Sequence, residues 1–260
     1  MKKAILYLFI ISLAACSNST GNTSESSNDS TAKQPIAEEK TPMSSMATGC
    51  SSYYWFKEGT VAEYSIKDIA GNETSRTTST VKNVRTEDGA LRADFVTTTS
   101  KGNAITATYK CEGDKIYMDM KSFFQNNFNG LAAKGGMEME VENAYLSFPA
   151  DMKPGDELEG ANFKIIAKKD GKPLMTTTNQ VKDRKVESIE NITTLAGSWN
   201  CLKITEHSII TSEMMGKALP GKETKNVYWF APGVGFIKND TYDKDGKLIM
   251  ESELVSLKEK

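Results

Sequence analysis

Hydrophobic and polar residues alternate in short runs from residue 60 to residue 257. Met137, Met139 and Val141 fall on one face of the run 137–148, and three glutamates fall on the other. A period of two residues is typical of a β-strand with one buried face. The runs expected to form strands are 60–68, 74–85, 90–99, 104–111, 115–119, 137–148, 163–169, 174–181, 185–194, 198–212, 224–230, 235–242 and 248–257.

Turn signals separate these runs at short intervals. Asp88-Gly89, Asp170-Gly171 and Asp245-Gly246 supply the positive-φ residues that tight hairpins need. The pattern therefore predicts an all-β protein: a single large antiparallel β-barrel or half-barrel of about a dozen strands, because closure removes exposed sheet edges. One short helix is expected from Met120 to Lys134, ended by Gly135-Gly136 and placed to plug the open face of the sheet.

The N-terminal segment has a different pattern. Lys2 and Lys3 precede an apolar run over 4–11, and the segment ends in Leu13-Ala14-Ala15-Cys16. This is the layout of a signal peptide over 1–15, and Cys16 stands where a bacterial lipobox places the cysteine that is acylated. The alternative is an ordinary secretory signal followed by an incidental cysteine. By analogy with lipoprotein sorting, Ser17 favours the outer membrane.

The next segment, 16–49, is rich in Ser, Asn, Thr and Pro and lacks apolar periodicity. This composition predicts a disordered, flexible tether, with a root-mean-square span of roughly 30 Å. The β domain is then expected over 50–260, in a cell-envelope protein held on a membrane through acylated Cys16.

Composition excludes several classes of function. The chain has 32 Lys and Arg against 34 Asp and Glu, and loss of 1–15 makes it more acidic. This net charge argues against nucleic-acid binding and against electrostatic binding of the whole domain to anionic lipid. His207 is the single histidine, and catalytic or metal-site motifs are not present. We therefore predict no catalytic residue, metal or cofactor, although a pair of carboxylates acting on glycosides stays open.

Three cysteines remain beside Cys16, and they lack the close spacing of zinc or redox sites. An oxidising compartment favours one disulfide and one leftover thiol. The preferred pair is Cys50–Cys111, because Cys50 enters the domain beside an aromatic cluster and Cys111 shares a strand face with Tyr109. Cys201 would then be packed in the core. The other two pairings stay open on sequence alone.

Methionines are spread through the domain. Methionine is flexible and polarizable, and it is common on surfaces that accept varied apolar ligands. The residues expected to line such a site are Met118, Met120, Met137, Met139, Phe123 and Phe128. The alternative is that these side chains fill an irregular core. Aromatic residues around the Pro232-Gly233 turn, together with those over 53–56, are expected to close one end of the barrel.

Several motifs resemble those of a known group. They are Cys50-Ser-Ser-Tyr-Tyr-Trp-Phe-Lys-Glu-Gly-Thr, Tyr109-Lys-Cys-Glu-Gly-Asp, Lys153-Pro-Gly-Asp, Ala196-Gly-Ser-Trp-Asn-Cys-Leu-Lys-Ile and Trp229-Phe-Ala-Pro-Gly-Val-Gly-Phe-Ile-Lys. In order and spacing the chain resembles the TapB-like lipoproteins over nearly all of 50–257. The resemblance implies a β-barrel or half-barrel on the bacterial envelope and implies no catalytic residues.

Three functions follow as hypotheses. The first is a non-enzymatic binder of a hydrophobic or envelope ligand. The second is a structural module for envelope assembly, and the third is an envelope hydrolase. A continuous apolar cavity favours the first hypothesis, and a filled core with one flat exposed patch favours the second. Two carboxylates about 5–9 Å apart in a cleft favour the third.

Overall fold

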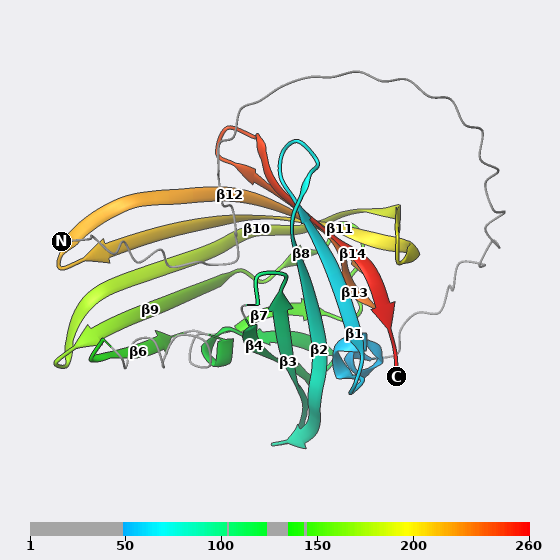
Figure 1. Ribbon diagram of the computed structural model, residues 1–260, viewed down its shortest axis with the longest axis horizontal. Helices are drawn as coiled ribbons and strands as arrows, with labels where there is room; N and C mark the ends of the chain where they lie inside the picture. Colours follow the sequence, from blue (N-terminus) through cyan, green and yellow to red (C-terminus); the bar gives the residue numbers. More distant parts are fainter. Residues whose placement is uncertain (1–48, 103, 124–134, 143–144) are drawn as a thin grey trace. The chain divides into compact units, whose positions relative to one another are not determined.

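The computed structural model describes residues 49–102, 104–123, 135–142 and 145–260 (Figure 1). Two short 3-10 turns, η1 (Cys50–Ser52) and η2 (Tyr54–Phe56), come first. The strands are β1 (Val61–Lys67), β2 (Glu73–Glu87), β3 (Ala90–Thr99), β4 (Ala104–Glu112), β5 (Lys115–Asp119), β6 (Met137–Glu142), β7 (Tyr145–Pro149), β8 (Glu157–Leu158), β9 (Ala161–Lys169), β10 (Lys172–Thr194), β11 (Gly197–Met214), β12 (Lys217–Ala231), β13 (Gly235–Asp243) and β14 (Leu248–Lys258).

All fourteen strands belong to one sheet, and every pair in it is antiparallel. The order is β6-β9-β10-β11-β12-β13-β14-β1-β2-β3-β4-β5-β7, with β8 against β10. The edge strands β6 and β7 follow each other in the chain, separated only by residues 143 and 144. The sheet therefore curves until its two edges approach each other, but among the described residues no ladder joins these edges into a closed barrel.

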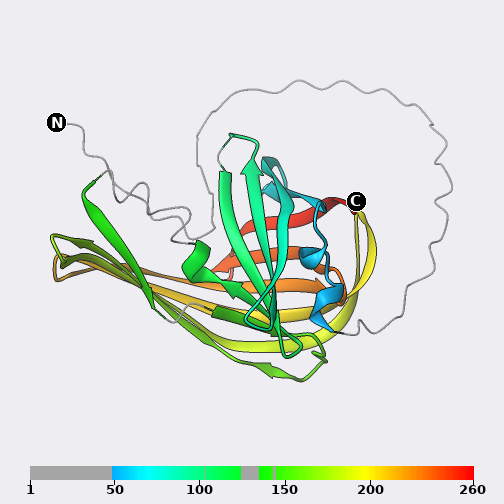
Figure 2. The same cartoon turned by 90° about the horizontal axis from the view of Figure 1, so that it is seen from below.

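One part of the sheet extends beyond the rest, toward the left in Figure 1. We call this part the wing: β6, β9, the first part of β10, the last part of β11 and the first part of β12 (residues 137–142, 161–181 and 208–224). Figure 2 shows the curvature that carries the wing away from β1–β5. The remainder of the sheet, with η1 and η2, is called the closed end.

Aromatic side chains fill the closed end. Trp55 stacks on Tyr109, with ring centroids 4.8 Å apart, and Phe148 stacks on Phe230 at 5.9 Å. Gly235, at φ +132°, gives room for this packing, because a Cβ atom there would lie 2.7 Å from the Trp55 ring. Because side chains alternate along each strand, the strand-borne rings lie on one face of the sheet. The turns η1 and η2 place the aromatic side chains of residues 50–56 against that face.

The predicted all-β half-barrel is confirmed, with fourteen strands in place of about a dozen. The expected strands 174–181 and 185–194 are one strand, β10. The predicted helix begins as a helical turn over 120–123, and its remainder lies outside the described residues. Within the part that is described, no helix has the length and apolar character to cross a membrane.

Candidate functional site

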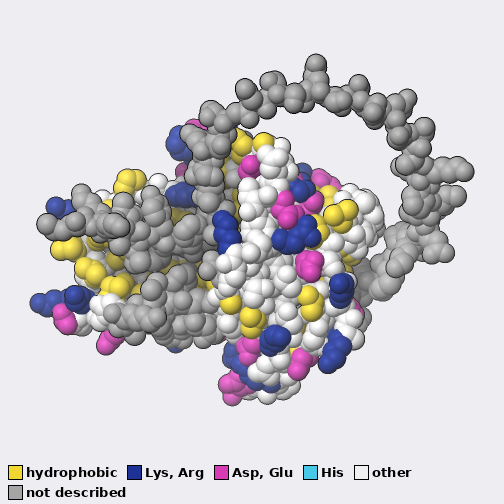
Figure 3. Space-filling model, viewed as in Figure 1, with side chains coloured by type: hydrophobic (Ala, Val, Ile, Leu, Met, Phe, Trp, Pro, Cys, Tyr) yellow, Lys and Arg dark blue, Asp and Glu magenta, His cyan; other side chains and the backbone are white. Residues whose placement is uncertain are grey.

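The inner face of the wing carries a row of methionines. Met139 on β6 lies opposite Ala167 on β9, Ala167 opposite Met175 on β10, and Met175 opposite Met214 on β11. Residues directly opposite each other share a face of an antiparallel sheet. Hydrophobic side chains are visible over the wing in Figure 3. Met214 remains 41% exposed, so the distal end of this row is open.

The next rows toward the closed end mix apolar and small polar side chains. The Thr177 and Ser212 hydroxyls lie 3.0 Å apart, and the Ser208 hydroxyl donates to Asn179 Oδ1 at 2.7 Å. Phe163 on β9 lies opposite Asn179 and belongs to the core cluster. These four polar side chains hydrogen-bond to one another across β10 and β11. An apolar ligand on the inner face of the wing would therefore leave each of them with a hydrogen-bond partner.

A buried ion pair stands where the wing meets the closed end. Arg184 Nε lies 3.1 Å from Glu206 Oε2, and the two side chains are 0% and 3% exposed. Glu206 Oε1 also accepts from the Tyr228 hydroxyl at 2.8 Å and from Asn226 Nδ2 at 3.4 Å. We call these four residues the polar knot. Burial, with Glu206 nearby, raises the pKa of Tyr228 well above its ordinary value, so its hydroxyl stays a donor.

Arg184 also links the interior strand β10 to the edge strand β7. Its Nη1 donates to the backbone oxygen of Ser147 on β7 at 3.0 Å and to that of Glu159 at 2.6 Å. The guanidinium carbon lies 4.7 Å from the Phe148 ring centroid. These contacts connect β10 with the edge strand β7, which it does not meet in the ladder. The polar knot thus holds the curved sheet near closure.

A β-bulge aims Arg184 inward. Lys182 pairs with His207 and Lys185 pairs with Thr205, so Asp183 and Arg184 together oppose Glu206. Asp183 takes φ +53°, and the extra residue shifts the alternation so that Arg184 faces the interior. Sequence analysis did not identify the polar knot. The alternation of β11 could have indicated it, because Glu206 lies on the same face of the strand as the inward residues Ile204 and Ser208.

The outer face of the wing is different. Glu142 lies 3.3 Å from Lys164 and Glu140 pairs with Lys168, both lysines on β9. Glu138, Glu140 and Lys164 are all partly or fully exposed. Among the described residues, no group of three His, Cys, Asp or Glu is arranged to hold a metal ion. These alternating glutamates therefore form a solvated, lysine-paired surface.

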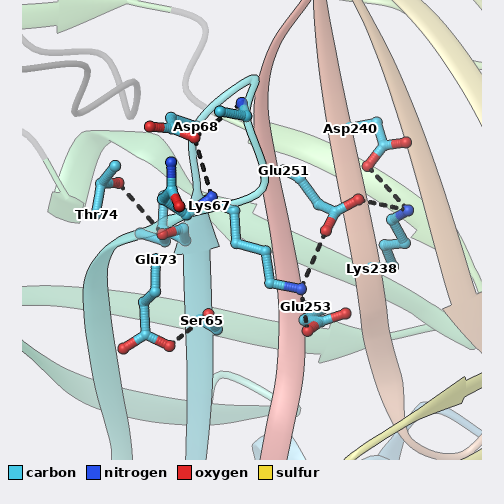
Figure 4. Close-up of polar contacts among 12 residues, drawn as sticks. Ser65, Lys67, Asp68, Glu73, Thr74, Lys238, Asp240, Glu251 and Glu253 are labelled. Atoms are coloured by element: carbon cyan, nitrogen blue, oxygen red, sulfur yellow. Dashed lines mark hydrogen bonds and ion pairs between the residues drawn. The ribbon is translucent and has the colours of Figure 1, made fainter. Parts of the chain in front are cut away.

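A second charged cluster crosses β1, β13 and β14 at the closed end (Figure 4). Lys67 Nζ lies 3.3 Å from Glu251, and Lys238 Nζ lies 2.8 Å from the same carboxylate and 3.4 Å from Asp240. Burial opposes the charge of Glu251, yet the two lysines hold its pKa below the ordinary value. Each charge in the cluster has an opposite charge beside it, so the cluster links strands and does not offer a binding site.

Two other features fit a functional site less well. A hollow of about 430 Å³ at the β4–β5 turn is lined by residues that are mostly exposed or half-buried, namely Gly49, Gly113, Asp114, Lys115, Pro149, Ala150 and Asp151. His207 is 40% exposed, and its Nδ1 lies 3.2 Å from Asp183 Oδ2. Neither place combines burial with converging polar groups.

The structure divides the residues expected to line a ligand site. Met137 and Met139 lie on β6 in the wing, whereas Met118 and Met120 pack partly buried against the core of the closed end. Phe123 is buried. Phe128 and the lipidation candidate Cys16 lie outside the described residues. Met175 and Met214, which complete the row in the wing, were not among the predicted lining residues.

The cysteines are arranged as the sequence analysis prefers. Cys50 and Cys111 form a disulfide with Cα atoms 5.8 Å apart, which fixes η1 to β4. Cys201 is free and buried. Burial, and then the charge of Glu190, raises the pKa of the Cys201 thiol to about 12, so it stays protonated and unreactive at neutral pH.

Comparisons with known proteins agree with this architecture. The family model described as DUF3108-like matches residues 57–254. A Bacteroides fragilis protein with a YmcC-like fold, inferred to be exported, is 17% identical, with a TM-score of 0.57 over 79% of this chain and 98% of that one. An inferred lipoprotein of Parabacteroides distasonis is 23% identical, with a TM-score of 0.58 over 78% of this chain and 96% of its own. No curated protein matches.

Proposed function

This chain belongs to the DUF3108-like family, and we propose that it is a cell-envelope lipoprotein whose wing binds a hydrophobic ligand. The observation that carries the proposal is the row of Met139, Met175 and Met214 across three strands of the inner face. Unbranched, polarizable side chains adapt to ligands of varied shape. From this row toward the closed end, the inner face continues through the internally bonded polar side chains to the polar knot.

Two observations support the location. The segment Leu13–Cys16 has the features of a lipobox, and the composition of 16–49 suits a tether. One structural neighbour is inferred to be exported and the other to be a lipoprotein. Acylation of Cys16 would hold the domain at the outer membrane. Membership of the narrower TapB-like group belongs to this proposal as well.

The site suits binding better than catalysis. Glu206, the carboxylate on the inner face of the polar knot, is already neutralised by Arg184 and bonded by Tyr228. A carboxylate held in this way is a poor general base or nucleophile. The methionine row exposes apolar surface. Covering it with an apolar ligand contributes about 25 cal/mol of binding free energy for each Å² buried. We therefore assign the protein no catalytic step.

Native mass spectrometry of the protein purified from its own membranes tests the proposal. Wild type is expected to carry a non-covalent lipid adduct. Met175→Lys, which places a charge in the middle of the row, is expected to lose it. Leu195→Lys is the matched control, because Leu195 is 83% exposed at the other end of β10. Absence of an adduct in wild type, or equal adducts in all three proteins, would contradict ligand binding in the wing.

An assembly module is the second candidate function, and the edge strand β6 favours it. In the described sheet β6 pairs on one side, with β9. A free strand edge offers backbone groups to a partner strand. A photo-crosslinker at Glu138 separates the two functions. Capture of one envelope protein by a lipid-free preparation would favour assembly, whereas a lipid adduct without capture favours ligand binding.

A further inference from the structure

The far end of the wing is built from two neighbouring hairpins. The β9–β10 turn spans Lys169 to Lys172, and the β11–β12 turn spans Met214 to Lys217. Met175 lies opposite Met214, so the two turns stand side by side. Figure 1 shows both at the same end of the sheet, and Figure 3 shows lysine and hydrophobic side chains together there. We call this end the wing tip.

The wing tip exposes apolar side chains. Met214, Met215 and Leu219 are 41%, 73% and 39% exposed. Three of the seven exposed large hydrophobic residues in the described chain thus lie on one hairpin. Scattered single exposures are normal, whereas a local group suggests contact with an apolar partner.

Met215 also occupies a turn position that does not favour methionine. It has φ +51° and is followed by Gly216 at +77°. The other described non-glycine residues with positive φ are all aspartates: Asp88, Asp114, Asp170 and Asp183. Asp and Asn are common in this region of backbone conformation. An unbranched apolar side chain has no local hydrogen bond that would stabilise it there. A strained, exposed methionine is therefore a sign of function.

The charge of the wing tip identifies the partner. Lys169, Lys172, Lys217 and Lys222 are exposed, against the acids Asp170, Glu213 and Glu223, so the wing tip has a surplus of one positive charge in a chain whose net charge is −2. Exposed apolar groups surrounded by lysines match the interface of an anionic lipid bilayer.

The opposite end of the same strands provides a comparison. β10 has 23 residues and follows a path of about 70 Å. Its far turn exposes Leu195 and Ile189, at 83% and 60%. The only charges within 187–200 are the acids Glu187 and Glu190. Exposed apolar residues therefore occur at both ends, but positive charge accompanies them at the wing tip.

We propose that the wing tip docks on the surface of an anionic lipid bilayer, through Met214, Met215 and Leu219 with the surrounding lysines. Docking there brings the open end of the methionine row to the lipid. The inference needs no ligand in the wing, and it stands or falls separately from the proposed binding function.

A fluorophore sensitive to lipid tests the docking. The full chain with Leu219→Cys is labelled with a nitrobenzoxadiazole maleimide and placed on vesicles of phosphatidylethanolamine and phosphatidylglycerol that carry nitroxide-labelled acyl chains. Cys201 is buried and the other two domain cysteines form the disulfide. Wild-type protein labelled in parallel is the control for Cys16. An acylated Cys16 has no free thiol and takes up no label, so labelling of wild type would contradict the lipid anchor.

The probe at position 219 is expected to be quenched, and the same probe at Leu195→Cys is expected to remain bright. Lys172→Glu with Lys217→Glu should reduce docking by about fivefold or more for each reversed charge. Vesicles of phosphatidylcholine alone should quench less. Quenching that is absent at position 219, or equal at 195 and 219, would overturn the proposal. Quenching that requires the addition of envelope proteins to the vesicles would point to a protein partner and overturn the proposal too.

The variant Met215→Asn separates an effect on docking from an effect on folding. Asparagine suits the positive φ at this turn, so the variant is expected to unfold at the same temperature as wild type or higher. In the Leu219→Cys background it should nevertheless reduce quenching severalfold. A variant that keeps full quenching would contradict a docking role for Met215.

Discussion

The closed end and the wing are made of the same alternating strands, but their inner faces are filled differently. At the closed end, rings such as Trp55 and Phe230 are 2% and 0% exposed and pack against each other. In the wing, Met175 and Ser212 are only half-buried. Rigid aromatic packing specifies one arrangement, whereas methionines and paired hydroxyls allow several. The closed end therefore fixes the sheet, and the looser filling of the wing supports the proposal that it adapts to a ligand.

The polar knot lies at the boundary between these two regions. Its ion pair is buried, and Arg184 reaches the edge strand β7 through Ser147. A buried ion pair contributes little net stability compared with apolar packing, but breaking it is costly. The knot is therefore best understood as a device that sets the curvature of the sheet, on which the shape of the wing depends.

The largest effect is expected from removing one partner of this pair. Arg184→Met should lower the free energy of unfolding by about 3–5 kcal/mol, because it leaves Glu206 buried without a cation. Urea unfolding measures the loss. Arg76→Met, which removes an exposed partner of Glu73, is the control and should cost less than about 1 kcal/mol. Equal losses in the two variants would mean that the knot has no special role.

Truncations in the two inner faces should differ clearly. Phe230→Ala should cost about 3–5 kcal/mol, because it opens a cavity among packed rings. Met175→Ala should cost about 1–2 kcal/mol, since its side chain is only half-buried. The same urea titration measures both. A loss at Met175 as large as that at Phe230 would show that the wing is ordinary core.

The disulfide should stabilise the closed end. Replacing Cys50 and Cys111 by alanine removes a link between residues 61 positions apart. The loss of this constraint on the unfolded chain is expected to lower the free energy of unfolding by about 4 kcal/mol. Thermal unfolding measures the change. Peptide mapping of the non-reduced protein checks the premise, and a bridge containing Cys201 would contradict it.

The smallest effect is expected in the half-buried charged cluster of Figure 4. Lys67→Met removes contacts with Glu251 and Glu253, whose side chains are both 21% exposed. Partly solvated ion pairs are screened by water and salt, so the cost should stay below about 1 kcal/mol and shrink further at high salt. A larger loss of unfolding free energy that does not depend on salt would mean that this cluster behaves like the buried polar knot.

Much of the closed end can be predicted from sequence because its signals are local. The Asp-Gly turns and the period of two give the hairpins and hence the all-β fold. The ring cluster follows from aromatic residues at inward positions beside the turn at Pro232. Trp229 differs from this expectation: it shares a row with Lys203 and Lys238, whose Nζ atoms lie 5.6 and 5.0 Å from its ring centroid.

The wing and the polar knot depend on register between distant strands. A bulge at Asp183 reverses the inward phase of β10, and a charged run such as Lys182–Lys185 is typical of an exposed turn. Sequence analysis consequently divided β10 in two and placed Arg184 between strands. Met139, Met175 and Met214 come from separate strands, so their common row becomes visible only once the pairing is known.

Methyl NMR of the protein labelled at methionine methyl groups tests the central claim most directly. A lysophosphatidylglycerol added below its micellar concentration supplies the apolar ligand. We expect the Met139, Met175 and Met214 resonances to shift together and saturably, while Met118 and Met250, which belong to the closed end, remain in place. Shifts spread evenly over all methionines, or confined to the closed end, would contradict a ligand site in the wing.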